Sequence, residues 1–316
     1  MTEFEIVLYL VGGLVMLFIG AEGLIRGSSN LAIKIGITPL VVGLTVVAFG
    51  TSAPELVVSL KAALLGNGSI SIGNVIGSNI ANIALIVGIA SLIRPMDVHA
   101  NVIRREIPIM IGVSMMLILF LIDGEIGFID GLIFVIGLII YLVFNVMLAL
   151  KEKNPEVDLE FEEGLKSKIG IPLSIILMIV GLGLLVLGAN LFVQSAVAIA
   201  KIFNVSDAII GLTIVAIGTS LPELITSIVA SIKKESDLAI GNVVGSNIFN
   251  ILGILGITAL IIPISAAGIS YVDFGIMLLT AIILFPLSRT GFSISRFEGM
   301  ILLLGYLGYM YYLLPK

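Results

Sequence analysis

The stretch GLTVVAFGTSAPEL, residues 43–56, returns with few changes as GLTIVAIGTSLPEL at residues 211–224. The likeness extends well beyond these fourteen positions. A shift of 168 positions aligns residues 39–95 with residues 207–263 without a gap, and 29 of the 57 aligned positions are identical. The chain is therefore an internal duplication, and any account of its fold has to place two equivalent units.

The composition excludes an ordinary soluble domain. Of the 316 residues, 59% are hydrophobic and 12% are charged, where soluble proteins carry about 25% charged residues. The apolar stretches run continuously without the alternation of a barrel strand, so we expect helices in a lipid bilayer. The predicted fold is an all-α polytopic membrane protein. Its ten predicted transmembrane helices are residues 4–26, 39–65, 71–93, 103–122, 126–150, 169–200, 207–232, 238–262, 270–288 and 297–314.

Each copy of the repeat lies within a set of five predicted helices. Residues 1–150 form the first five-helix repeat, residues 151–168 a cytoplasmic linker, and residues 169–316 the second repeat. Because five is odd, the second repeat enters the membrane from the opposite side, and the repeats have inverted topology. Secondary transporters use this plan and bind substrate near the middle of the membrane. A duplication kept only for packing is the alternative, but the identical positions include polar residues that packing would not select.

The distribution of positive charge predicts the orientation. With the N-terminus outside, 13 of the 16 lysines and arginines lie on the cytoplasmic side, namely Arg26, Lys34, Arg94, Arg104, Arg105, Lys151, Lys153, Lys166, Lys168, Lys233, Lys234, Arg289 and Arg296, and only Lys61, Lys201 and Lys316 lie on the other. We therefore expect a multi-pass protein of the cell membrane with both termini on the extracytoplasmic side. The N-terminal MTEFE is acidic where a signal peptide is basic, so the first helix should remain in the mature chain.

Several kinds of partner are not expected. The chain has no cysteine, which excludes disulfides, thiolate metal sites and cysteine nucleophiles. We expect no cofactor, no enzymatic activity and no nucleic-acid partner, and nothing requires more than a monomer. The linker KEKNPEVDLEFEEGLKSK, residues 151–168, reads as a solvated segment. A calcium-sensing role for the linker stays open, although it lacks the ligand pattern of an EF-hand loop.

Glu55 follows Pro54 inside an apolar span, and Glu223 follows Pro222 in the second copy. Proline has no N–H and its ring displaces the carbonyl four residues earlier, so we expect each helix to kink and release backbone oxygens. A carboxylate at this depth is costly and is by default functional. Snorkelling or pairing with a cation is the alternative, but the nearest cation, Lys61, stands nearly two turns away.

Hydroxyl groups share a helical face with each glutamate: Thr51 and Ser52 with Glu55, and Thr219 and Ser220 with Glu223. If the inverted repeats bring both carboxylates together, they cannot both stay ionised without a proton or a metal cation. The carboxylates and the two threonines supply about six oxygen ligands, which suits Ca²⁺. Zinc, copper and iron favour imidazole or thiolate, and the single histidine, His99, falls in a cytoplasmic loop.

A second duplicated motif reads IGNVIGSNIAN at residues 72–82 and IGNVVGSNIFN at residues 240–250. Gly73 and Gly77 form a small-xxx-small pattern that close helix packing can explain. Packing does not explain the polar residues of the motif. Ser78 and Asn82 stand four residues apart on one face, as do Ser246 and Asn250, so they can direct neutral oxygens towards the carboxylates.

On these motifs the sequence resembles the cation/calcium exchanger superfamily, and its sodium/calcium exchangers of the prokaryotic ten-helix type in particular. GTSAPE (50–55) and GTSLPE (218–223) stand where the two hallmark repeats of that family carry kinked, glutamate-bearing helices. The resemblance implies a secondary antiporter that exchanges Na⁺ for Ca²⁺ by alternating access. It also implies that the first helix of each half forms a tilted pair that slides over the others. Small residues in these two helices are Gly12, Gly13, Gly20, Gly23, Gly181, Gly183 and Gly188.

The resemblance also implies a set of metal-ion ligands. Glu55, Glu223, Thr51 and Thr219 would form the central calcium site; the Ala48 carbonyl, Ser52 and Ser246 one sodium site; the Ala216 carbonyl, Ser220 and Ser78 another; and Asn82 and Asn250 the middle of the cluster. Some members of the family, including potassium-dependent ones, carry aspartate where this chain has Asn250. The amide leaves two formal negative charges, which argues against potassium co-transport.

Three alternatives stay open at this point. A proton/calcium exchanger of the same fold would trade the metal for protons on the same carboxylates, although the hydroxyl and carbonyl sodium sites speak against it. A passive cation channel is disfavoured because channels build their pores from rings of identical elements. An intramembrane hydrolase would need a nucleophile and base within the helices, and the sequence offers no such pair.

Overall fold

The computed structural model describes residues 2–151, 169–202, 216–267 and 269–313. Within these residues the chain is almost entirely helical, as expected for an all-α protein. The predicted linker lies outside the described residues from position 152 onward, and so do positions 207–215 of the helix predicted at 207–232.

Residues up to 151 form a run of helices with two short strands. The elements are α1 (Glu3–Ile35), α2 (Pro39–Val42), the π-helical η1 (Gly43–Val47), α3 (Ala48–Thr51), α4 (Ala53–Leu64), α5 (Gly68–Ile80), the π-helical η2 (Ala81–Val87), α6 (Gly88–Ile93), β1 (Met96–Asp97), the π-helical η3 (Val102–Glu106), α7 (Ile107–Phe120), β2 (Glu125–Ile126) and α8 (Phe128–Lys151).

The second part of the chain repeats this order. Its elements are α10 (Ile171–Ile202), α12 (Ala216–Thr219), α13 (Leu221–Ile232), α14 (Ser236–Phe249), the π-helical η5 (Asn250–Leu255), α15 (Gly256–Ile261), β3 (Ile264–Ser265), α16 (Tyr271–Arg289), β4 (Ser293–Ile294) and α17 (Arg296–Leu313). Helix therefore occupies most of the described residues in each predicted span, although Ile126 lies in β2 and Leu65, Leu121 and Ile122 lie in turns. Six helices in the described part are long and apolar enough to cross a membrane, or seven if the bent pair Pro39–Thr51 and Ala53–Leu64 counts as one span.

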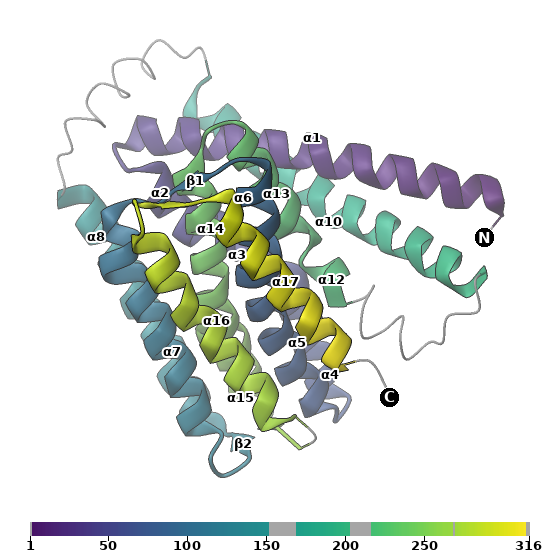
Figure 1. The fold of residues 1–316 in the computed structure, drawn as a ribbon, viewed down its shortest axis with the longest axis vertical. Coiled ribbons are helices and arrows are strands. Elements are labelled where there is room, and N and C mark those ends of the chain that lie inside the picture. Colours follow the sequence, from purple (N-terminus) through teal and green to yellow (C-terminus); the bar gives the residue numbers. More distant parts are fainter. Residues whose placement is uncertain (1, 152–168, 203–215, 268, 314–316) are drawn as a thin grey trace.

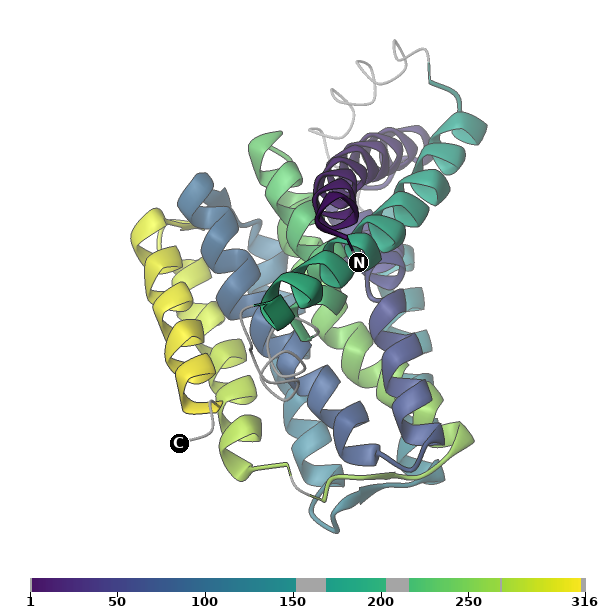
Figure 2. The same cartoon turned by 90° about the vertical axis from the view of Figure 1, so that its right-hand side faces the viewer.

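The two long helices α1 and α10 lie side by side along one flank of the molecule (Figures 1 and 2). They are antiparallel, because Gly13 meets Gly188 while Gly20 meets Gly181. A Cβ atom built on Gly20 would lie 2.8 Å from the Gly181 carbonyl oxygen, and one built on Gly13 would lie 2.8 Å from the Gly188 carbonyl oxygen. The predicted close approach is confirmed at these four glycines. Gly12 and Gly183 take no part in it, since neither has a described atom within 4 Å of the Cβ position.

Two short antiparallel ribbons tie the repeats together at opposite ends of the molecule (Figure 1). Strand β1 pairs with β4, with Met96 opposite Ile294, and β2 pairs with β3, with Ile126 opposite Ile264. The same shift of 168 positions makes Met96 equivalent to Ile264 and Ile126 equivalent to Ile294. The pairing of β1 with β4 is therefore equivalent to the pairing of β3 with β2 when the two repeats are exchanged.

The duplicated glycine motif packs closely in its second copy. A Cβ on Gly241 would lie 2.8 Å from the Leu40 carbonyl oxygen, and one on Gly245 would lie 2.6 Å from the Leu44 carbonyl oxygen. Helix α14 therefore rests directly on the backbone of α2 and η1, which brings the second motif against the first glutamate-bearing segment. For Gly73 and Gly77 the described residues show no comparable contact, since a Cβ on Gly73 has its nearest neighbour at 3.4 Å and one on Gly77 has none within 4 Å.

Candidate ion-binding site

Both glutamate-bearing helices break two residues before their proline, at Ser52 and at Ser220. Helix α3 ends at Thr51 and α4 begins at Ala53, and the two segments on either side of Ser52 are bent by 44°. Ser52 has φ −82° and ψ 5°, and Ser220 has φ −88° and ψ 8°, so neither serine is helical. The predicted kink is confirmed in the first copy, and the second copy has the same break between α12 and α13. Each break leaves a serine hydroxyl at the turn, one helical turn before a glutamate.

Each of these serines contacts the glutamate of the other repeat. The Ser52 hydroxyl donates a hydrogen bond of 2.9 Å to Oε1 of Glu223, and the Ser220 hydroxyl donates one of 3.0 Å to Oε1 of Glu55. The two contacts are exchanged by the same shift of 168 that relates the repeats. The two carboxylates are close enough to act on each other electrostatically. The repeats thus build one shared site between them.

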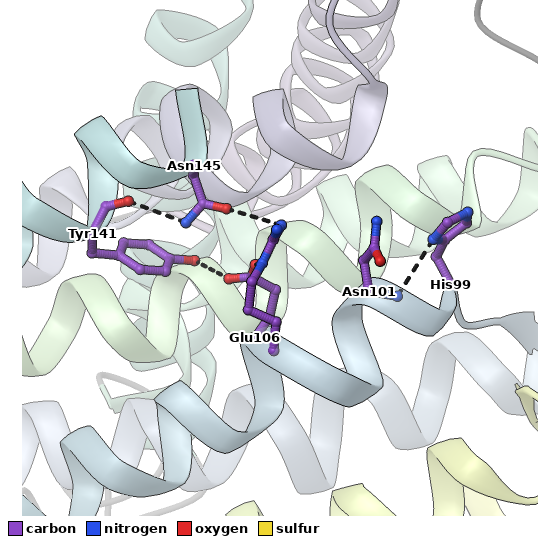
Figure 3. A network of polar contacts seen from close by, with 6 residues as sticks. His99, Asn101, Glu106, Tyr141 and Asn145 are labelled. Carbon is purple, nitrogen blue, oxygen red and sulfur yellow. Dashed lines mark hydrogen bonds and ion pairs between the residues drawn. The ribbon is translucent and has the colours of Figure 1, made fainter. Parts of the chain in front are cut away.

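The two carboxylates are buried without a compensating cation. Glu55 and Glu223 are each 1% exposed, and neither forms an ion pair with any residue that the structure describes. Glu106 is the other fully buried acid of this part of the chain, and it is neutralised. Its carboxylate contacts Nε of Arg105 at 2.6 Å and accepts a hydrogen bond of 2.8 Å from the Tyr141 hydroxyl (Figure 3). The charge of Glu106 is therefore neutralised by Arg105 of the same segment, η3, and Tyr141 links it to α8, whereas no described cation pairs with Glu55 or Glu223.

Unpartnered buried oxygens gather among the predicted ligands. Across the described residues, eleven buried side-chain atoms lack a hydrogen-bond partner, and five belong to the predicted set: Glu55 Oε2, Glu223 Oε2, Asn82 Oδ1, Asn250 Oδ1 and Ser246 Oγ. A buried polar group without a partner costs about 1–3 kcal/mol, so a cluster of them needs an explanation. All five atoms can act as ligands for a hard cation.

The two asparagines of the set lie at the start of π-helical segments. Asn82 is the second residue of η2, and Asn250 is the first residue of η5. Single π-turns inside α-helices occur often at functional sites, because they displace the side chains from the regular helical register. The Asn82 amide donates to Oδ1 of Asn247 at 3.1 Å, and the Asn250 amide donates to Oδ1 of Asn79 at 3.0 Å. Each amide nitrogen is thereby used, and each amide oxygen is left free.

The remaining predicted ligands surround this centre. The hydroxyl oxygens of Ser78 and Ser220 lie 3.1 Å apart, and the Thr51 hydroxyl donates to Oδ1 of Asn242 at 3.1 Å. Ala48 is fully buried beside α14, where a Cβ on Gly245 would lie 2.9 Å from its own Cβ. The side chain of Thr219, the last residue of α12, interacts with the Glu55 carboxylate. That helix begins at Ala216.

Residues of the second motif that the sequence analysis passed over also belong to the site. Asn74 donates to the Glu55 carbonyl oxygen at 3.2 Å and to the Ser59 hydroxyl at 2.9 Å. In the other copy Asn242 donates to the Ser227 hydroxyl at 3.2 Å. These asparagines, like Asn79 and Asn247, are identical in both repeats, and that identity is the signal that could have found them.

The arrangement offers hard oxygen atoms and little charge. The residues described in the structure contain no group of three or more histidine, cysteine, aspartate or glutamate side chains that could hold a metal. The site instead combines two carboxylates with hydroxyl and amide oxygens. Calcium accepts six to eight such oxygens, whereas zinc and copper prefer nitrogen or sulfur. The donor set therefore suits hard cations such as Ca²⁺ and Na⁺.

Comparisons with known proteins agree on one family. The family model described as "Sodium/calcium exchanger protein" matches residues 5–147 and 173–314. The Inner membrane protein YrbG of Escherichia coli (strain K12) is 39% identical over 278 residues, which are 87% of this chain and 86% of that protein. The Sodium/calcium exchanger MaX1 of Methanosarcina acetivorans is 33% identical over 346 residues, with 96% of this chain and 97% of that protein covered.

The fold is also similar to a solved exchanger. A structure of the sodium-calcium exchanger NCX_Mj soaked with zero Na⁺ and Ca²⁺ matches with a TM-score of 0.85 at 33% identity, covering 99% of this chain and 100% of that chain. A structure of the same exchanger soaked with 2.5 mM Na⁺ and 0.1 mM Ca²⁺ also matches with a TM-score of 0.85. The similarity covers both repeats of the chain.

Proposed function

Since the chain belongs to the sodium/calcium exchanger protein family, we propose that it is a secondary antiporter of the cell membrane that exchanges Na⁺ for Ca²⁺ by alternating access. Glu55 and Glu223 bind the ions, and the hydroxyl, amide and carbonyl oxygens around them complete the coordination. The transported ions are substrates, and the protein acts as a monomer with both termini outside the cytoplasm.

One observation carries the proposal. Glu55 and Glu223 are brought together by reciprocal serine contacts, and each keeps one buried oxygen without a partner, as do Asn82 and Asn250. A cation at this centre satisfies all of them at once and also neutralises two like charges that would otherwise repel each other.

The chemistry of the two carboxylates gives a reason for exchange. Na⁺ and Ca²⁺ both need these oxygens, so they compete, and the site holds one type of ion at a time. The empty site carries two negative charges, which are costly to move through a low-dielectric barrier. An ion-loaded site is neutralised and can change sides. Transport of one ion is thereby tied to return of the other.

The arrangement of the repeats supports ten transmembrane helices with inverted topology. The reciprocal serine–glutamate contacts and the exchange of the two strand ribbons both follow from one pseudo-two-fold relation. The two ribbons, which are copies of one another, lie at opposite ends of the molecule (Figure 1), as inverted repeats require. Such a fold can open to either side by exchanging the conformations of its halves.

The test is ion-driven uptake into vesicles that contain the purified protein. Vesicles loaded with Na⁺ and diluted into Na⁺-free buffer with labelled Ca²⁺ should accumulate calcium, and vesicles with an imposed proton or K⁺ gradient should not. Glu55→Gln should abolish the uptake, whereas Glu125→Gln in the exposed β2 ribbon should preserve it. Uptake driven by a proton gradient alone would instead establish a proton/calcium exchanger, and equal uptake without any gradient would establish a channel.

A further inference from the structure

We propose that Asn79 and Asn247 are specificity-determining positioning residues, which turn the side-chain amides of Asn250 and Asn82 so that oxygen and not nitrogen faces the ions. The inference rests on the proposed function and extends it. It assigns a role to two residues that touch the ligands rather than the cation. It also explains how an exchanger site works with only two carboxylates.

The orientation of Asn79 is fixed by a backbone carbonyl of the other repeat. Its side-chain nitrogen donates to the Asn247 carbonyl oxygen at 3.2 Å, and that oxygen can only accept. Asn79 must therefore direct its own Oδ1 the other way. There it accepts the hydrogen bond of 3.0 Å from the Asn250 amide. Because Asn250 has to donate, its remaining oxygen is the atom left for the ions.

The orientation of Asn247 is fixed in a similar way by a sulfur atom. Its side-chain nitrogen lies 3.4 Å from the Met110 sulfur, which is a weak acceptor and carries no hydrogen. Its Oδ1 accordingly faces Asn82 and accepts from the Asn82 amide at 3.1 Å. The Asn82 oxygen is then the free one. Each of the two series of hydrogen bonds thus begins at an acceptor that cannot donate, the Asn247 carbonyl or the Met110 sulfur, and ends at an unpartnered amide oxygen.

All four asparagines are buried, so water cannot replace these contacts. Asn79 and Asn247 are 2% and 1% exposed, and Asn82 and Asn250 are each 1% exposed. Reversing the amide of Asn250 would place its oxygen against the Asn79 oxygen and aim N–H groups at the cation. Each such error in a buried site weakens binding by about 10- to 100-fold. The asparagine pairs thereby keep donors out of the ion site.

The same geometry selects an amide over a carboxylate at position 250. A carboxylate there has no hydrogen to give to Asn79, so two oxygens would stand about 3.0 Å apart and repel. Asn79 cannot turn over to relieve this, because its nitrogen is held by the Asn247 carbonyl. Asn79 therefore limits the site to the two formal charges of Glu55 and Glu223.

A double-mutant cycle on equilibrium Ca²⁺ binding to the detergent-purified protein tests the proposal. Asn79→Leu removes the acceptor with little change of volume and should weaken Ca²⁺ binding by about 10- to 100-fold. Asn250→Asp in the parent background should weaken it as well, because the new carboxylate meets the Asn79 oxygen. In the double variant that oxygen is gone, so the added carboxylate should bind Ca²⁺ more tightly than Asn79→Leu alone.

Asn250→Asp should thus weaken Ca²⁺ binding in the parent and strengthen it in Asn79→Leu, and this reversal distinguishes a positioning role from a structural one. A purely structural role of Asn79 would lower thermal stability, and the effects of the two substitutions on Ca²⁺ binding would be additive. Ser114→Ala is the matched control, because Ser114 is equally buried but its hydroxyl bonds within its own helix to the Met110 carbonyl at 2.9 Å. Additive effects, or unchanged Ca²⁺ affinity in Asn79→Leu, would overturn the proposal. If Asn79→Leu does not fold, Asn247→Leu with Asn82→Asp forms the equivalent cycle. Sodium-driven uptake by the parent protein is scored separately, so loss of exchange and loss of the asparagine effect are distinct outcomes.

Discussion

Replacing Glu55 with glutamine should change ion binding and ion-free stability in opposite directions. The side chain keeps its size, but one of the two buried negative charges disappears. Without ions, the parent protein has to hold both carboxylates in a site that no cation of the described residues neutralises. The variant removes that repulsion, so its ion-free form should be more stable than the parent. With Ca²⁺ present, the order should reverse.

The magnitudes follow from the contacts. Ser220 donates to Glu55 at 3.0 Å and precedes Glu223 by three residues, so we take the separation of the two carboxylates as about 6 Å, the range within which charges shift each other's ionisation. At that separation and an effective dielectric constant near 20, their repulsion is about 3 kcal/mol, an upper limit for the gain in ion-free stability. Removing one partner of a buried charge contact costs about 2–5 kcal/mol of binding, which is roughly a 30- to 4000-fold loss of Ca²⁺ affinity.

Thermal unfolding in detergent at alkaline pH measures both effects. Calcium at about 100 times its dissociation constant stabilises the parent by roughly 2.7 kcal/mol, and the same concentration should stabilise Glu55→Gln by less than about 1 kcal/mol. Glu125→Gln, at an exposed site, should behave as the parent. A variant that is less stable than the parent without ions, yet is stabilised by Ca²⁺ to the same extent, would contradict the assignment of Glu55 as a ligand.

Two further predictions concern the fold and the orientation. Gly181→Ala should lower stability by about 1–3 kcal/mol, because its Cβ would meet the Gly20 carbonyl oxygen at 2.7 Å. Gly12→Ala, with no described atom within 4 Å of its Cβ position, should keep the stability or raise it by up to about 1 kcal/mol. Because the chain has no cysteine, single-cysteine labelling is unambiguous: a membrane-impermeant thiol reagent added to intact cells should label Thr2→Cys and should not label Asp97→Cys. Labelling of Asp97→Cys alone would reverse the proposed orientation.

The kink and the buried acids could be predicted because their cause is local. Pro54 lies in the first turn of α4, where the missing N–H has no intrahelical acceptor, and Glu55 follows it directly. The duplication then predicted that a second acid, Glu223, would meet the first. The reciprocal contacts with Ser52 and Ser220 agree with that prediction, although the pairing across repeats depends on how the two units fold together.

The asparagine contacts could not be predicted from spacing alone. Helical periodicity placed Ser78 and Asn82 on one face, which indicated the proposed ligands but not the asparagines that contact them. Asn79 contacts the opposite repeat, where its side-chain amide donates to the backbone carbonyl of Asn247. Periodicity describes one helix at a time, so an interaction that starts in one repeat and ends in the other stays invisible to it.

Helix ends were predicted less well than helix centres. The first span was expected to end near residue 26, where the polar residues begin, but α1 continues to Ile35. The extension is stable because Asn30 donates to the Ser174 hydroxyl at 2.6 Å and to the Ile169 carbonyl oxygen at 3.2 Å. A hydropathy threshold cannot anticipate a polar segment that a neighbouring helix satisfies.

The glycine contacts between α1 and α10 fix the register of the two helices. Gly13, Gly20 and Gly27 meet Gly188, Gly181 and Ser174 in turn, so the close contacts recur every seven residues. To slip to the next matching set, one helix would have to travel about 10.5 Å along the other. These contacts therefore favour movement of α1 and α10 together over sliding of one helix past the other. In the proposed exchanger, a helix pair that moves as one unit would close one side of the ion site as it opens the other.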